Sequence, residues 1–195
     1  KAALAQYPHI ADAYNSVADN ETEAVTALNS AFVQDGAVVY IPSGVKAEKP
    51  FVLDFGYSSD EVQQMCFTRA LVIAGESSKA DVVICHRDNG KTAFLVDFVK
   101  ETLAGENSEV NISELSMPGS RSAVIAGSYV RQVAGSKVNT MNVWLDGGTT
   151  RVNSVTDLAG PGADSTLYGL YFGSDSPRID ININVKHMVA ACTSV

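Results

Sequence analysis

The sequence predicts a mainly β protein, folded as a parallel β-helix (solenoid) with short helices at its N-terminal end. Three observations lead to this prediction. Apolar residues before position 33 have helical spacing, the residues after Gly36 have strand composition, and one short phrase recurs at steps of about 30 residues. A repeat of this length is typical of solenoids, because each coil buries its apolar face only by stacking on its neighbours.

Residues 1–35 form the predicted N-terminal helical segment. Asn20 and Glu23 have the spacing of a capping box, which marks the start of a helix. We expect two helices within residues 3–31, which shield the first coil or pack along the side of the β-helix. The apolar residues that recur at three- and four-residue steps are Leu4, Tyr7, Ile10, Tyr14 and Val17, followed by Val25, Leu28 and Phe32.

Residues 36–195 form the predicted β-helix core. The phrase AGESSKAD at 74–81 returns as AGENSEVN at 104–111, and a looser copy lies at 158–172. Gly75, Gly105 and Gly135 are evenly spaced, and each follows an alanine. Glycine reaches backbone conformations that are closed to other residues. We therefore expect these three glycines to stack at one corner of the solenoid.

The clearest strand is RIDININVKH at 178–187. Ile179, Ile181, Ile183 and Val185 share one face of it, and polar residues share the other, so it has one dry and one wet side. As the last readable strand it is expected to face solvent, unless the chain continues with further coils or another chain pairs there.

An antiparallel β-sandwich is the alternative architecture. Asp88, Asn89 and Gly90 separate two apolar runs, and Asn-Gly between strands is a strong hairpin signal. The recurrence favours the solenoid, because the strands of a sandwich occupy unlike environments and have no reason to keep a repeat.

Composition limits the possible partners and location. The chain has 195 residues, with 22 acidic and 14 basic side chains and a net charge of -8, so a phosphate backbone would be repelled and no nucleic acid partner is expected. It has neither a signal-peptide pattern nor a run of 18 apolar residues, so no membrane partner is expected. The three cysteines lack CxxC spacing, which fits a reducing cytoplasm.

Five side chains are candidates for metal chemistry, and none is predicted to be a ligand. Cys85 and His86 are adjacent, so on a strand they point to opposite faces and do not share a metal. Cys66 has an apolar setting typical of a core filler. We expect His187 to form a hydrogen bond at the end of its strand. Cys192 lies five residues beyond it, and the two side chains would supply only half of an iron or zinc site.

No enzymatic site is predicted either. A carbohydrate-active β-helix protein, such as a polysaccharide lyase or hydrolase, is the alternative function, and it needs paired carboxylates or calcium-binding acidic clusters. The densest acidic groups, SSDE at 58–61 and DFVKE at 97–101, are interpreted as solvated strand or turn positions. The sequence has no Walker A phosphate loop, and the Gly147–Gly148 pair is interpreted as a tight turn.

Four phrases resemble the SufB/SufD scaffold family of the Suf iron-sulfur cluster assembly system. They are YIPSGVKAEKPFVLDFG at 40–56, ALVIAGESSKADVVICH at 70–86, ETLAGENSEV at 101–110 and GADSTLYGLYF at 162–172. The resemblance covers most of residues 25–195. The phrases ALNSAFVQDGAVVYIP and IDININVKHMVAACTS make the SufD branch the nearer one, and the cysteine-rich N-terminal motif expected of a SufB is absent.

The resemblance implies a right-handed parallel β-helix and a non-catalytic scaffold subunit of a SufBCD complex. It implies a SufB-like subunit and a SufC-like ATPase as partners, with a homodimer also possible. The iron-sulfur cluster is expected at the level of the assembled complex, and no cofactor is expected on this chain. Family members continue past CTSV with more coils and a C-terminal helical segment. The histidine proposed to act at the SufB/SufD interface lies in that later region and has no counterpart here.

Overall fold

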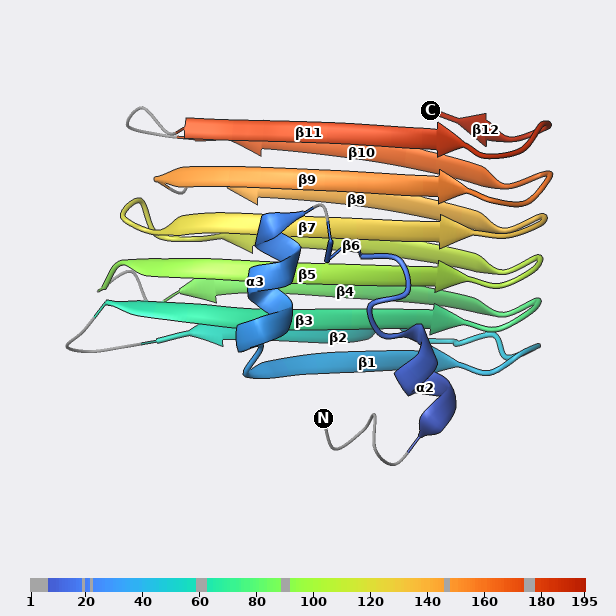
Figure 1. The fold of residues 1–195 in the computed structure, drawn as a ribbon, viewed down its shortest axis with the longest axis horizontal. Helices are drawn as coiled ribbons and strands as arrows, with labels where there is room; N and C mark the ends of the chain where they lie inside the picture. The colour runs from blue at the N-terminus through green and yellow to red at the C-terminus, as the bar shows by residue number, and fades with distance from the viewer. Residues whose placement is uncertain are drawn as a thin grey trace.

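The chain winds through two six-stranded parallel sheets that face each other. The computed structural model describes residues 7–18, 20–21, 23–58, 63–88, 92–145, 148–173 and 178–195. Sheet A has the order β1-β3-β5-β7-β9-β11 and sheet B the order β12-β10-β8-β6-β4-β2. The front strands in Figure 1 run to the right, the rear strands return to the left and the chain climbs, so the winding is right-handed. The strands of sheet A are β1 (Asp35–Ile41), β3 (Gln64–Ala74), β5 (Phe94–Ala104), β7 (Ala123–Gln132), β9 (Thr149–Leu158) and β11 (Arg178–His187), and those of sheet B are β2 (Phe51–Tyr57), β4 (Lys79–Asp88), β6 (Glu109–Met117), β8 (Lys137–Leu145), β10 (Asp164–Phe172) and β12 (Thr193–Ser194).

The predicted solenoid is confirmed, and the β-sandwich is wrong. Consecutive strands alternate between the sheets, and all of the strand pairs in both sheets are parallel. Asn89 and Gly90 lie outside the described residues. The strands on either side of them, β4 and β5, belong to different sheets, so they do not form a hairpin.

The repeated phrase does mark a corner, but its glycines do not form one column. Ala74 pairs with Ala104, which places Gly75 beside Gly105. Ala104 pairs with Gln132, so the next residue in that column is Val133, and Gly135 comes two positions later. The coils differ in length, and an equal spacing in sequence therefore does not preserve the register.

The feature that does repeat at this corner is one left-handed residue in each coil. These residues have φ between 55° and 76° and lie two positions before strands or bridges that pair in register. Ser77 and Asn107 occupy the position that glycine takes in other coils. The column consists of Gly44, Ser77, Asn107, Gly135, Gly162 and Ala191. The feature that recurs in each coil is thus the turn conformation, and glycine is only one of the residues that can adopt it.

Apolar side chains from both sheets fill the inside of the coils. Val72 of sheet A and Ile84 of sheet B are each 0% exposed. Inward-pointing residues alternate with outward ones along each strand, as in β6 and β9. In β11 the predicted dry face is only partly buried: Ile181 packs against the core, but Ile183 is 53% exposed. The β11 strand is the outermost strand of sheet A among the described residues, as the sequence led us to expect.

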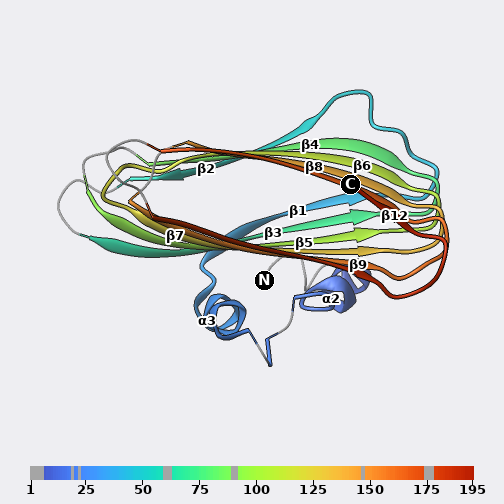
Figure 2. The ribbon, with the colours of Figure 1, turned by 90° about the horizontal axis from the view of Figure 1, so that it is seen from above.

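The two helices in the described residues lie against the outer face of sheet A (Figure 2). They are α2 (Pro8–Ala13) and α3 (Ala24–Phe32), and together they cover only part of the range 3–31 in which we expected two helices. The predicted capping box is wrong, because the N-cap residue is Glu23 and no side chain caps the helix. Asn20 instead accepts a hydrogen bond from Ser30 Oγ at 2.9 Å. No helix in the described part of the chain is long and apolar enough to cross a membrane.

The apolar stripe of α3 is not the face that packs on the sheet. Thr26 and Asn29 are buried, whereas Leu28 is 38% and Phe32 58% exposed. Asn29 Nδ2 lies 3.0 and 3.1 Å from the carbonyl oxygens of Asp97 and Thr68. Side-chain hydrogen bonds to the strand backbone therefore orient this helix, rather than apolar burial alone.

The prediction that DFVKE is solvated is wrong. Asp97 is 1%, Lys100 1% and Glu101 0% exposed. Glu101 accepts hydrogen bonds from the backbone amides of Asn15, Val17 and Ala18 and pairs with Arg69 at 3.0 Å. These buried charges fasten the N-terminal segment to sheet A. Most of SSDE lies outside the described residues, and its first residue, Ser58, is exposed.

Candidate functional site

Five polar side chains lie inside the β-helix at one end of the apolar core. They come from both sheets, and none is more than 8% exposed. We call this set the interior cluster, and it consists of Tyr57, Thr68, His86, Lys100 and Glu114. Buried ionisable groups of this kind need partners, because a charge removed from water is costly unless it is paired.

Strand alternation places these residues in the interior. Lys100 continues the inward face of Phe94, Val96 and Phe98 on β5, and the backbone gives it no other direction. His86 follows Ala80, Val82 and Ile84 on the inward face of β4 in the same way. In sheet B, Phe55 of β2 pairs with His86, so an aromatic ring lies directly beside the imidazole.

The interior cluster joins the two sheets across the core. Lys100 Nζ of sheet A donates to Glu114 Oε2 of sheet B at 2.6 Å. The other carboxylate oxygen, Oε1, lies 3.7 Å from His86 Nε2. The Tyr57 hydroxyl lies 3.3 Å from His86 Nδ1 and 3.0 Å from Thr68 Oγ1, which returns to sheet A.

The electrostatics of this cluster follow from burial and one strong pair. Burial lowers the pKa of His86 to about 4, the Lys100 ammonium acts in the same direction, and the Glu114 carboxylate opposes them. The imidazole is therefore neutral at neutral pH. Burial alone would raise the pKa of Glu114, but Lys100 and His86 together lower it below the usual value. Burial also raises the pKa of Tyr57, so its hydroxyl stays protonated.

Aromatic rings surround the imidazole. His86 stacks on Phe55 with ring centroids 5.1 Å apart and meets the edge of Phe98 at 4.3 Å. A small cavity with room for about one water molecule adjoins it, lined in part by Tyr57, Ser116 and Trp144. His86 Nε2, Ser116 Oγ and Trp144 Nε1 have no hydrogen-bond partner among the described residues.

Chemically, the site combines a fixed ion pair, a neutral imidazole and polar atoms that line the cavity. It can bind a small polar molecule through those atoms, and it ties sheet A to sheet B. The polar and apolar groups around it are rigid strand residues, so the geometry is held in one arrangement. These residues belong to the same domain core and not to a surface cleft.

The residues singled out from sequence lie apart from one another. His86 is 5% exposed and points inward, while the half-buried Cys85 points away from the core, as predicted. Cys66 is half-buried against the core, where burial raises the pKa of its thiol. His187 forms the expected hydrogen bond, with Nε2 3.0 Å from Ser194 Oγ. The Cys192 thiol lies 3.3 Å from the Gly160 carbonyl oxygen, so it and His187 have separate partners.

No group of three or more His, Cys, Asp or Glu side chains is positioned to hold a metal ion in the ranges that the structure describes. Sequence reasoning missed Tyr57, Thr68, Lys100 and Glu114. A usable signal existed, because Lys100 and Glu114 have the same parity as the apolar inward residues of their strands. The segment DFVKE was nevertheless interpreted as solvated because of its charges, since lysine and glutamate are seldom fully buried unless they are paired.

Comparison with known proteins supplies the family. Residues 55–195 match the family described as SUF system FeS cluster assembly, SufBD core domain. Residues 1–53 match the SufBD protein N-terminal region. The chain belongs to the SufBD family. It is also 22% identical over 173 residues to an iron-sulfur cluster assembly SufBD family protein of Mycobacterium leprae, an alignment that covers 89% of this chain and 43% of that relative.

The SufBD core domain contains all residues of the interior cluster, from Tyr57 to Glu114. The family's two regions meet inside β2, whereas the helices end at Phe32 and β1 begins at Asp35. The SufBD N-terminal region therefore includes the first strand of the β-helix as well as the helices.

Proposed function

We propose that this chain is a scaffold subunit in iron-sulfur cluster assembly, of the SufD-like kind, and that it is not itself an enzyme. The observation that supports this most directly is the match of residues 55–195 to the SufBD core domain on a parallel β-helix. The chain spans 43% of the length of its Mycobacterium leprae relative, so this proposal concerns the role of the whole protein.

The proposed partners are a SufB-like subunit and a SufC-like ATPase. The ATPase would supply the nucleotide chemistry, because the sequence has no Walker A phosphate loop. The iron-sulfur cluster is cargo assembled on the complex, and this chain is proposed to hold no cofactor of its own. Its three free cysteines agree with the cytoplasmic location that we propose.

Rigidity is the property that a scaffold requires, and the fold offers two sources of it. Stacked parallel strands give each coil two neighbours, and the buried pairs Lys100–Glu114 and Arg69–Glu101 fix the sheets and the N-terminal segment.

The test is co-expression of the full-length protein with its SufB-like and SufC-like candidates. One component carries an affinity tag, and the composition of the purified complex is measured by native mass spectrometry. We expect a complex of all three that accepts an iron-sulfur cluster, detected by its visible absorption. A protein that stays alone while the other two associate contradicts the proposal.

The alternative of a carbohydrate-active β-helix protein rested on architecture alone. One architecture supports many unrelated activities, and no observation on this chain favours that one.

A further inference from the structure

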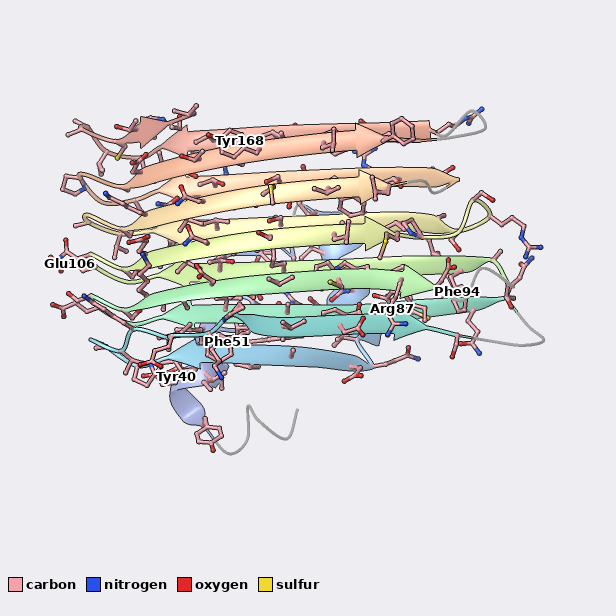
Figure 3. All side chains as sticks on the ribbon, turned by 180° about the vertical axis from the view of Figure 1, so that it is seen from behind. Tyr40, Phe51, Arg87, Phe94, Glu106 and Tyr168 are labelled. Atoms are coloured by element: carbon pink, nitrogen blue, oxygen red, sulfur yellow. The ribbon has the colours of Figure 1, made fainter. Side chains whose placement is uncertain are left out.

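The cavity beside His86 lies where two large rings flank a small side chain. His86 pairs with Ser116, and Ser116 pairs with Trp144, so the three inward side chains lie side by side on β4, β6 and β8. Because serine is much smaller than the imidazole and indole rings on either side of it, the space above it is not filled. Figure 3 shows Arg87, which also lines this cavity, towards one end of the coils and Glu106 at the other.

Each of these three side chains has one polar atom without a hydrogen-bond partner among the described residues. The atoms are His86 Nε2, Ser116 Oγ and Trp144 Nε1, and the residues are 5%, 1% and 2% exposed. An unpaired polar group that is removed from water is costly, and native proteins pair nearly all such groups. The cavity has a volume of about 10 Å³, which is about what one water molecule needs. A ligand with one heavy atom can therefore pair all three atoms at once.

The groups around the cavity decide the chemical class of this ligand. The Glu114 carboxylate oxygen Oε1 lies 3.7 Å from His86 Nε2 and favours the imidazole proton on that nitrogen. Nδ1 is then the acceptor for the Tyr57 hydroxyl, which lies 3.3 Å away. The cavity thus faces two N–H donors, His86 Nε2 and Trp144 Nε1, which disfavour a cation. The nearby carboxylate disfavours an anion, so the ligand is neutral.

We propose that one water molecule is bound in this cavity and joins His86, Ser116 and Trp144. It accepts hydrogen bonds from His86 Nε2 and Trp144 Nε1, and it donates one to Ser116 Oγ. Buried waters typically make about three such bonds. The water extends the hydrogen bonding of the interior cluster to the next coil, because Trp144 belongs to β8 whereas Glu114 belongs to β6. It also holds the imidazole in one tautomer, since it accepts a bond from Nε2 only when the proton is there.

A high-resolution crystal structure of the full-length protein tests the proposal. We expect one water peak at about 2.7–3.2 Å from each of the three polar atoms. Ser116→Val replaces the hydroxyl by two methyl groups that fill the cavity, so its crystal structure should show no water there. Thr102→Val is the matched control. It removes another buried hydroxyl without a partner among the described residues, but Thr102 does not line the cavity, so the water should remain.

The tautomer of His86 gives a second readout, in solution. Nitrogen NMR of the full-length protein with isotope-labelled histidine distinguishes the two neutral tautomers, and the signals that disappear in His86→Asn belong to His86. We expect the proton on Nε2 at neutral pH. The wild-type measurements decide the proposal even where a variant fails to fold. Three results overturn it: a dry cavity in the wild-type protein, a water that persists in Ser116→Val, or a wild-type His86 with its proton on Nδ1.

Discussion

Replacing Lys100 by methionine measures how strongly the interior of the solenoid depends on its buried ion pair. Methionine keeps most of the length of the side chain and removes the ammonium. The Glu114 carboxylate then lies in the core, 4% exposed, without the cation that was 2.6 Å away. Breaking a buried pair from one side leaves an uncompensated charge, which typically costs about 3–5 kcal/mol.

Proton uptake sets an upper limit on this cost. Glu114 can avoid the buried charge by binding a proton, and from an unfolded pKa of about 4.3 this costs about 3.7 kcal/mol at pH 7 and about 1 kcal/mol at pH 5. Protonation of His86, 3.7 Å from the carboxylate, offers a second route with the same pH direction. We therefore expect Lys100→Met to lose about 3–4 kcal/mol at pH 7 and clearly less at pH 5.

Urea unfolding at pH 7 and pH 5 measures these free energies. In a domain of this size the loss at pH 7 corresponds to a melting temperature lowered by about 6–16 °C. The matched control is Lys79→Met, which removes a pair of nearly equal length, 2.7 Å, whose side chains are 46% and 39% exposed. Water screens that pair, so no measurable loss is expected.

The double variant Lys100→Met, Glu114→Gln should recover most of the stability, because it leaves no buried charge. Two results would refute the reasoning. One is a loss at pH 7 that matches the Lys79→Met control, since the interior would then be hydrated. The other is a loss that grows from pH 7 to pH 5, since an uncompensated carboxylate requires the reverse.

Three further predictions concern other parts of the fold, each measured by urea unfolding. Burial lowers the pKa of His86 to about 4 in the native state, whereas the unfolded chain binds this proton near pH 6.5. As the pH falls from 7 to 5, the free energy of unfolding of the wild type should therefore decrease by about 2 kcal/mol more than that of His86→Asn. A parallel pH dependence of the two proteins would contradict this. Asn29→Ala should cost about 2–3 kcal/mol through its lost hydrogen bonds to the strand backbone, whereas Leu28→Ala on the exposed side should cost little. Ser77→Gly should stabilise the fold by about 0.5–1 kcal/mol, because Ser77 has φ 56°, a left-handed conformation that glycine adopts at lower cost. The neighbouring Ser78→Gly is the control and should destabilise the fold, because it removes the 2.7 Å hydrogen bond that Ser78 Oγ donates to the Gly75 carbonyl oxygen.

Strand positions and their inward faces were predictable from sequence to a useful degree. The alternation of Ile179, Ile181 and Ile183 placed β11, and the recurring phrase located the corner after β3 and β5. The same alternation would have placed Lys100 and Glu114 inside. Lys100 was instead interpreted as solvated because of its charge, and only the structure shows that Glu114 is its buried partner.

The sequence by itself determined that this chain stacks coil upon coil, because the period-2 alternation and the recurring turn are local properties of the backbone. It also contained the phrases that resemble the SufB/SufD family. Only the tertiary structure decided the register between coils, since coils of unequal length place Gly135 two positions beyond Gly75 and Gly105. It also decided the packing of α3, because the hydrogen bonds from Asn29 to residues 39 and 68 positions away depend on where distant strands come to lie.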